Sequence, residues 1–237
     1  MRTFRRPFRM ASASGLAAVA VYVAATVLGG LLAPGYSHVR DAISELTASH
    51  AAHRALLAVL YVGYNLLLVG FARGLVGPGP ASRLLRCALG LVVVASAAGI
   101  GQVTLFPQDS TGSPATARGA VHIVLAGISA LLCVVTALIY GVAFRRMGLS
   151  RRTWVPAFAV AAFLLLVGPA AAASVGGPLM GLFERCTIGG YLTWVAVTCV
   201  VLARVASREE FSGFRPGPDS APLHGARPAP VDAPPAR

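Results

Sequence analysis

The residues of this chain that could do chemistry are few, and most lie at the edges of long apolar segments. The densest group is PGYSHVRDAISEL at residues 34–46, which holds a histidine, two acids and an arginine directly after an uncharged segment. Carboxylates and imidazoles in such places can act as acids and bases, bind metals or pair with each other. The candidate site residues along the chain are Asp41, Ser44, Glu45, Gln102, Asp109, His122, Glu184 and Arg185.

Metal binding is the first chemistry to weigh. HAAH at residues 50–53 spaces two imidazoles as zinc ligands can be spaced. A third ligand could come from Asp41, Glu45 or His122. Short matches of this kind are common by chance, and the four cysteines have no metal or redox spacing. We therefore predict no metal and no cofactor, with a zinc site as a minor alternative.

Nucleophilic catalysis is the second kind of chemistry that these residues could support. Ser44 lies beside Glu45, and His122 could act as its base in an outward-facing hydrolase. No G-x-S-x-G elbow accompanies this serine. An intramembrane enzyme with a lipid-like substrate, using Glu184, His122 or Asp109 as acid or base, is therefore kept as an alternative.

The composition indicates a membrane protein. Only 12% of the residues are charged, 56% are hydrophobic, and the mean hydropathy is +0.72. A soluble domain carries about twice this fraction of charge. The net charge of +12 comes from small groups of arginines between apolar segments, as in oriented membrane helices. We therefore predict a lipid bilayer as partner and no nucleic acid.

Six segments are long and apolar enough to cross a bilayer. About twenty apolar residues span the hydrocarbon core, and a helix satisfies its own backbone there. The first segment follows four arginines but lacks a good signal-peptide cleavage site, so we expect an uncleaved span. The fold class is all-α: a polytopic integral membrane protein with six transmembrane helices, and Pro169 is expected to kink the fifth. The spans are residues 14–33, 55–75, 84–106, 120–143, 154–175 and 181–204.

Arginines orient this bundle. Sixteen of the twenty lie on the side that holds both termini, which by the positive-inside rule is cytoplasmic. We predict a basic cytoplasmic tail at 1–13, a transmembrane domain at 14–206 and a disordered Pro/Ala-rich cytoplasmic tail at 207–237, in a protein of the cell membrane.

Residues 34–46 then form the first outward-facing loop. On a helix His38, Asp41 and Glu45 share one side, and the apolar residues share the other. This spacing predicts a short amphipathic helix in the first outer loop, on the membrane surface or folded over the bundle. Its acidic side is either solvated or lines a site.

Charges inside the spans need partners, because each costs a few kcal/mol in a membrane. Glu184 and Arg185 are neighbours that point about 100° apart on a helix, so they cannot neutralise each other directly. Our hypothesis is that Arg185 pairs with Asp109 or Asp41, and Glu184 with His122.

Four polar segments lie in order at the ends of the predicted spans. They are PGYSHVRDAISEL, LFPQD at 105–109, His122, and GLFERCTIGGYLTW at 181–194. Together they resemble the domain-of-unknown-function 998 (DUF998) family over about residues 14–205. The resemblance implies a six-span integral membrane protein of bacteria or archaea and no particular reaction. Its pattern maps onto Asp41, Ser44, Glu45, Pro107, Asp109, His122, Glu184 and Arg185, and leaves out His38, His50 and His53.

These patterns favour a protein whose polar residues at the outer face bind a lipid head group or small polar ligand, or simply tie the helices together. A small-solute or proton-coupled transporter is a further alternative. Transporters usually place their sites near the midplane at broken helices, whereas these charges lie near one face.

Overall fold

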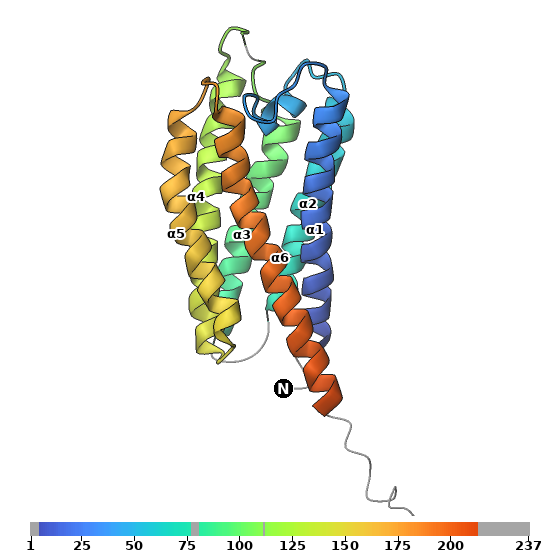
Figure 1. Ribbon diagram of the computed structural model, residues 1–237, viewed down its shortest axis with the longest axis vertical. Coiled ribbons are helices and arrows are strands. Elements are labelled where there is room, and N and C mark those ends of the chain that lie inside the picture. Colours follow the sequence, from blue (N-terminus) through green and yellow to red (C-terminus); the bar gives the residue numbers. More distant parts are fainter. Residues whose placement is uncertain (1–4, 77–80, 111, 213–237) are drawn as a thin grey trace, which may run out of the picture.

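Six long helices make up most of the described part of the chain, residues 5–76, 81–110 and 112–212 of a computed structural model (Figure 1). All six are long and apolar enough to cross a membrane, which confirms the predicted six-span bundle. The helices are α1 (Arg5–Leu32), α2 (Arg54–Leu75), α3 (Ser82–Thr104), α4 (Ala117–Arg146), α5 (Arg151–Ala173) and α6 (Met180–Ser212).

The helix ends differ from the predicted boundaries. Helix α1 begins at Arg5, inside the predicted basic tail, and α6 continues to Ser212, past the predicted start of the disordered tail. The rest of that tail, 213–237, lies outside the described residues. Helix α5 continues through Pro169 as one helix.

The helices form a ring in chain order. Each packs mainly against its neighbours in sequence, and α6 closes the ring against α1. A ring of this kind encloses an interior that side chains from several helices must fill. Figure 1 shows α4 and α5 on one side of the bundle and α1 and α2 on the other.

Aromatic side chains fill the interior on one level of the bundle. Phe71, Tyr140 and Trp194 are buried, and the Tyr140 ring lies 6.2 Å from Phe71 and 5.6 Å from Trp194 between centroids. Phe144 stacks on Tyr140 at 5.5 Å. Aromatic pairs add about 0.5–1.5 kcal/mol each beyond the area they bury. We call these four residues the aromatic layer; they belong to the main hydrophobic core of the bundle.

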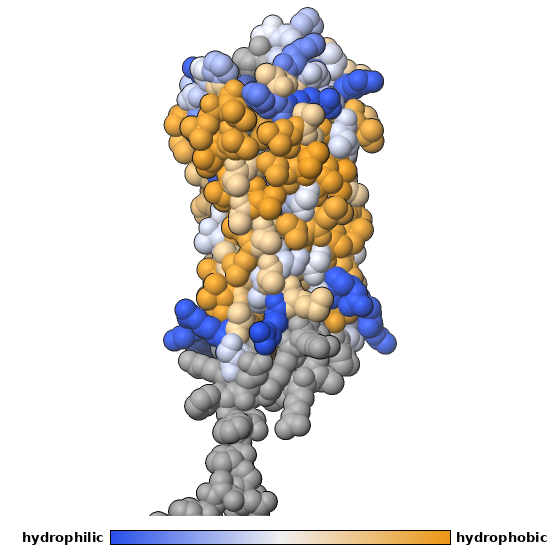
Figure 2. Space-filling model, turned by 90° about the vertical axis from the view of Figure 1, so that its right-hand side faces the viewer, coloured by the Kyte–Doolittle hydropathy of each residue, from blue (hydrophilic) through white to orange (hydrophobic). Residues whose placement is uncertain are grey.

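The two ends of the bundle differ in charge. One end, at the top of Figure 1, carries the connections α1–α2, α3–α4 and α5–α6; we call it the acidic end because Asp41, Glu45, Asp109 and Glu184 lie there. The opposite, basic end carries Arg73, Arg83, Arg86, Arg145, Arg146, Arg151, Arg152 and Arg204. On the face shown in Figure 2, hydrophilic residues gather at both ends and an apolar belt lies between them, as a bilayer requires.

The predicted short helix of the first loop is present as η2, a 3-10 helix over Ile43–Thr47. Ile43 and Leu46 are buried and pack beside Leu57 of α2. The helix does not reach Val39, which is 47% exposed. The physical reason is that carbonyls before η2, including that of Val39, accept hydrogen bonds from α6 instead of from a continuing helix.

Candidate functional site

The first loop is bound to the beginning of α6 through the backbone. The N–H of Leu182 donates to the carbonyl of Val39 at 2.9 Å, and that of Gly181 to Arg40 at 3.2 Å. The first N–H groups of a helix have no partner within it, so the loop supplies partners that α6 needs. A Cβ at Gly181 would collide with the carbonyl oxygen of Asp41. Only glycine therefore allows this close approach.

Glu184 and Arg185 continue this contact with their side chains. The Glu184 carboxylate accepts from the N–H of Ile43 at 2.6 Å, and so caps η2. Arg185 donates from Nη1 to the carbonyls of Asp41 at 3.0 Å and Gly181 at 2.9 Å. We call the set of bonds between Tyr36–Ile43 and Gly181–Arg185 the loop–helix contact.

Tyr36 joins both parts of the loop–helix contact. Its hydroxyl accepts from Nη2 of Arg185 and donates to the carbonyl of Ala42 at 2.9 Å. Burial raises the pKa of Tyr36 to about 12, although the hydrogen bond from Arg185 opposes this. The hydroxyl therefore keeps its proton at neutral pH and stays a donor to Ala42.

The side-chain pairs in our hypothesis are not the contacts that the structure shows. Arg185 reaches Asp41 through the backbone, while the Asp41 carboxylate binds Arg40, with Nε and Oδ1 2.7 Å apart. The hydrogen bond from Arg40 lowers the pKa of Asp41. Glu184 binds the Ile43 amide, and Nδ1 of His122 lies 2.8 Å from the carbonyl oxygen of Phe106.

Asp109 caps the start of α4. Its carboxylate accepts from the N–H of Thr116 at 2.8 Å and from the Thr116 hydroxyl at 2.7 Å, and that hydroxyl accepts from the N–H of Gly119 at 3.1 Å. The backbone and side-chain bonds from Thr116 lower the pKa of Asp109. A carboxylate is favourable at the N-terminal end of a helix dipole. Asp109 is thus a helix cap.

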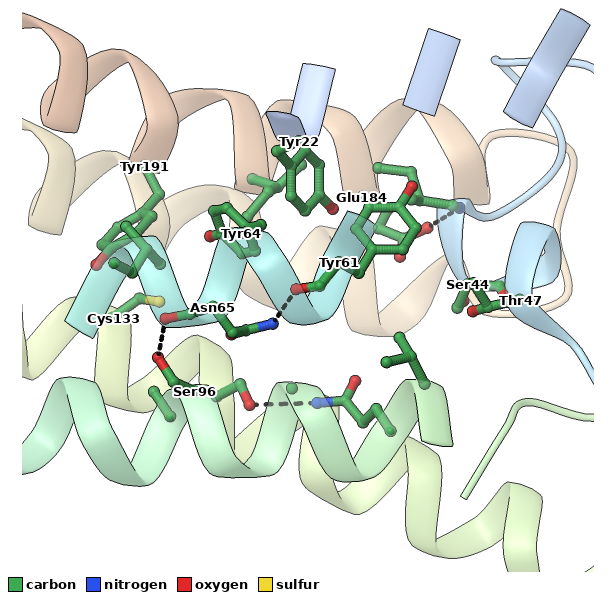
Figure 3. A pocket seen from close by; sticks show the side chains of 18 of the residues that line it. Tyr22, Ser44, Thr47, Tyr61, Tyr64, Asn65, Ser96, Cys133, Glu184 and Tyr191 are labelled. Carbon is green, nitrogen blue, oxygen red and sulfur yellow. Dashed lines mark hydrogen bonds between the residues drawn. The ribbon is translucent and has the colours of Figure 1, made fainter. Parts of the chain in front are cut away.

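A cavity of about 180 Å³ lies inside the ring, between η2 and the aromatic layer (Figure 3). Residues from α1, η2, α2, α3, α4 and α6 line it. Four of the eight predicted site residues are among them: Ser44, Gln102, His122 and Glu184. Asp41 and Glu45 line a separate hollow at the acidic end, next to His50 and His53. The predicted cluster is therefore divided between the cavity, the second hollow, the loop–helix contact and the α4 cap.

Some polar groups of the cavity wall bind each other. Nε2 of Gln102 donates to Ser129 at 3.3 Å, Nδ2 of Asn65 to the carbonyl of Tyr61 at 2.8 Å, and Ser44 to Oε1 of Gln108. The hydroxyls of Tyr22, Tyr64 and Tyr191 also line the cavity but make no hydrogen bond to the described residues. Tyr64 and Tyr191 are only 7% and 4% exposed. The wall thus offers three hydroxyls without a protein partner.

The described residues form neither the serine–histidine pair nor the metal site that the sequence suggested. Ser44 donates to Gln108, and His122 binds the carbonyl of Phe106. Ser44 and His122 therefore form no serine–histidine relay. Among the described residues, no group of three or more histidines, cysteines and acids is placed to hold a metal ion.

Sequence reasoning missed several residues of this site: Tyr22, Tyr36, Tyr64 and Gln108. Polar residues were predicted as site residues where they carry charge, lie inside a span or fit the family pattern. The three tyrosines are mostly apolar, and Gln108 lies between spans. A usable signal was present, because tyrosines in membrane proteins usually lie at the interfaces, whereas Tyr22 and Tyr64 lie well inside apolar spans.

The fold and site define a multi-pass membrane protein whose first loop covers a polar cavity inside a ring of six helices. Residues 16–201 match the family described as Protein of unknown function (DUF998), and the chain belongs to this family, as the resemblance in the sequence predicted. No curated protein and no solved structure matches the chain.

Proposed function

We propose that this protein binds the polar head of a small amphiphilic molecule in the cavity beneath its first loop. The observation that carries the proposal is that Ser44, Gln102, His122 and Glu184, from four separate elements, line one cavity. Helix pairing alone would not require polar residues from so many elements to line one space.

Size and polarity support a head group as the occupant. A cavity of about 180 Å³ is slightly larger than the ~150 Å³ cavity that holds one benzene, and smaller than a typical drug-sized pocket of ~300 Å³ or more. The side chains of Ser44, Gln102, His122 and Glu184 in its wall favour an occupant with polar atoms.

We further propose that the acidic end faces outward and both termini face the cytoplasm of the cell. Arginines gather at the basic end, and cytoplasmic loops carry the excess of arginine and lysine in membrane proteins. The cavity would then open toward the outer leaflet.

The aromatic layer favours binding over transport. Tyr140 is fully buried and Trp194 is 2% exposed, between the cavity and the basic end. A transporter must open its site to each side in turn. The contacts of Tyr140 with Phe71 and Phe144, in the halves of α2 and α4 nearer the basic end, support a cavity that is reached from the acidic end.

The test is to fill the cavity. Ala95 lines it, whereas Ala97 on the same helix is exposed. Wild type, Ala95→Phe and the matched control Ala97→Phe are reconstituted in nanodiscs of phosphatidylcholine, phosphatidylethanolamine and phosphatidylglycerol, and retained lipid is measured by native mass spectrometry. We expect the wild type and Ala97→Phe to retain lipid and Ala95→Phe to lose it. Equal retention by all three would contradict the proposal.

A further inference from the structure

We infer that the head group bound in the cavity is an organic cation, a quaternary ammonium or protonated amine. The inference rests on the proposed binding function and specifies its ligand. Four tyrosine rings and one carboxylate line the cavity, and no arginine or lysine among the described residues does. The tyrosines are Tyr22, Tyr61, Tyr64 and Tyr191, and the carboxylate is Glu184.

The rings are arranged as inclined walls. The Tyr22 ring lies 5.2 Å from Tyr61 at an interplanar angle of 61°, and 4.7 Å from Tyr64 at 67°. Figure 3 shows these three rings close together, with Glu184 beside them toward the loop. A cation within about 6 Å of a ring face is attracted to it. These rings contact each other edge to face, so the ring faces available to a cation are those that border the cavity.

Glu184 is the one acidic side chain among the described residues of the cavity wall. Its carboxylate accepts from Ile43, and a carboxylate has about four acceptor sites, so capacity remains for an ammonium donor. Glu184 also lies close enough to Tyr22 and Tyr61 to interact with them electrostatically. The carboxylate and the rings therefore lie close enough to contact the same bound group.

Arg185, the neighbour of Glu184, also acts electrostatically on Tyr22 and Tyr61, but it makes its hydrogen bonds outside the cavity wall. The guanidinium of Arg185 binds the carbonyls of Asp41 and Gly181 and the Tyr36 hydroxyl, and Arg185 is not part of the cavity wall. His122 lines the cavity with Nδ1 bound to the Phe106 carbonyl. A phosphate or carboxylate would meet the Glu184 carboxyl group with no arginine in the described cavity wall to bind it. A cation is the complementary ligand.

Two sources can supply this chemistry: a free organic cation, or a lipid with a choline or ethanolamine head. The cavity accommodates the ammonium group of either. The experiment therefore includes free choline and dihexanoylphosphatidylcholine as separate probes.

Trp194 provides the signal for the test. Its ring lies 5.5 Å from that of Tyr191, which lines the cavity. The chain has only one other tryptophan, Trp154, which packs on Phe158 in α5. The variant Trp154→Phe leaves Trp194 as the sole indole fluorophore. The full chain in a maltoside detergent is titrated with choline, with the neutral tert-butyl isostere of choline, and with dihexanoylphosphatidylcholine.

We expect choline or its lipid to bind about tenfold more tightly than the neutral isostere, as a desolvated cation–π site predicts. Equal affinity for choline and the isostere would overturn the cation inference and leave the proposed function intact. If no probe binds, and Ala95→Phe retains as much lipid as the wild type, both the cation inference and the proposed function are overturned. Binding of the lipid without free choline would identify the source as lipid.

Variants locate the effect. Tyr64→Leu removes a ring and should weaken choline binding about tenfold. Tyr64→Phe keeps the ring and should bind choline as the wild type does. Phe163→Leu is the control, because it replaces a ring that is 38% exposed and outside the cavity. Glu184→Gln removes only the charge, and should weaken choline but not its isostere. Unchanged choline affinity in both Tyr64→Leu and Glu184→Gln would overturn the inference.

Discussion

The carboxylate of Glu184 accepts a 2.6 Å hydrogen bond from the backbone N–H of Ile43, a residue 141 positions earlier in the chain. This bond joins the start of α6 to η2, the short helix that covers the cavity. The dense polar stretch between the first two spans is therefore not simply a solvated connection. Its backbone supplies partners for α6, and α6 supplies partners for it.

Glu184→Ala should loosen the first loop. The Ile43 amide would lose its acceptor, and an unsatisfied buried donor costs about 1–3 kcal/mol. Hydrogen exchange of residues 36–47, followed by mass spectrometry, should become faster, and the free energy of unfolding should fall by about that amount. Glu184→Gln is the matched control, because its amide oxygen can still accept from Ile43. Equal exchange in Ala, Gln and wild type would contradict this role.

Gly181→Ala should disrupt the same contact from the backbone side. A Cβ there would collide with the Asp41 carbonyl, and overpacking of this kind costs about 1–3 kcal/mol. Gly189, on the same helix, has open space where a Cβ would lie, so Gly189→Ala should be neutral or slightly stabilising. Thermal unfolding in detergent compares the two. Similar unfolding temperatures for both variants would show that the loop tolerates the methyl group.

The spans could be predicted because length and apolar composition alone decide whether a helix crosses a bilayer. The loop–helix contact could not, because its bonds use backbone groups of Val39, Arg40 and Ile43 whose position depends on the path of the whole loop. Our pairing hypothesis sought side-chain partners for Arg185, yet its guanidinium binds two carbonyls and a phenol.

The cavity was predictable only in part. Gln102, His122 and Glu184 were identified because polar groups in apolar spans must face the interior, and all three line the cavity. Asp109 lies between two predicted spans and was a candidate because of its charge and the family pattern. It caps α4, because the turn before that helix brings Thr116 to its carboxylate. The tyrosines were not predicted as site residues, because neutral rings carry no penalty that marks them in the sequence.

The cap formed by Asp109 predicts a pH dependence. Its pKa is lower in the folded protein than in the unfolded chain, so the ionised form contributes stability above the unfolded value of about 3.9. That contribution is lost as the pH falls through the lower, folded pKa. The difference in stability between wild type and Asp109→Asn should thus be constant from pH 7 to about 5 and shrink below about pH 4. Asp41 titrates in the same range in both proteins and cancels in the difference. A difference that does not change with pH would show that the charge of Asp109 is not what stabilises α4.

The proposed orientation predicts which end of the bundle a reagent reaches from outside the cell. Ser113, in the α3–α4 connection at the acidic end, and Ser150, between α4 and α5 at the basic end, are both exposed. With the four native cysteines replaced, Ser113→Cys should react with a membrane-impermeant maleimide in intact cells, and Ser150→Cys only after permeabilisation. The physical reason is that arginines resist transfer across the membrane during insertion and hold the basic end in the cytoplasm. The reverse labelling pattern would place the cavity on the cytoplasmic side, where the available head groups and organic cations are those of the cell interior.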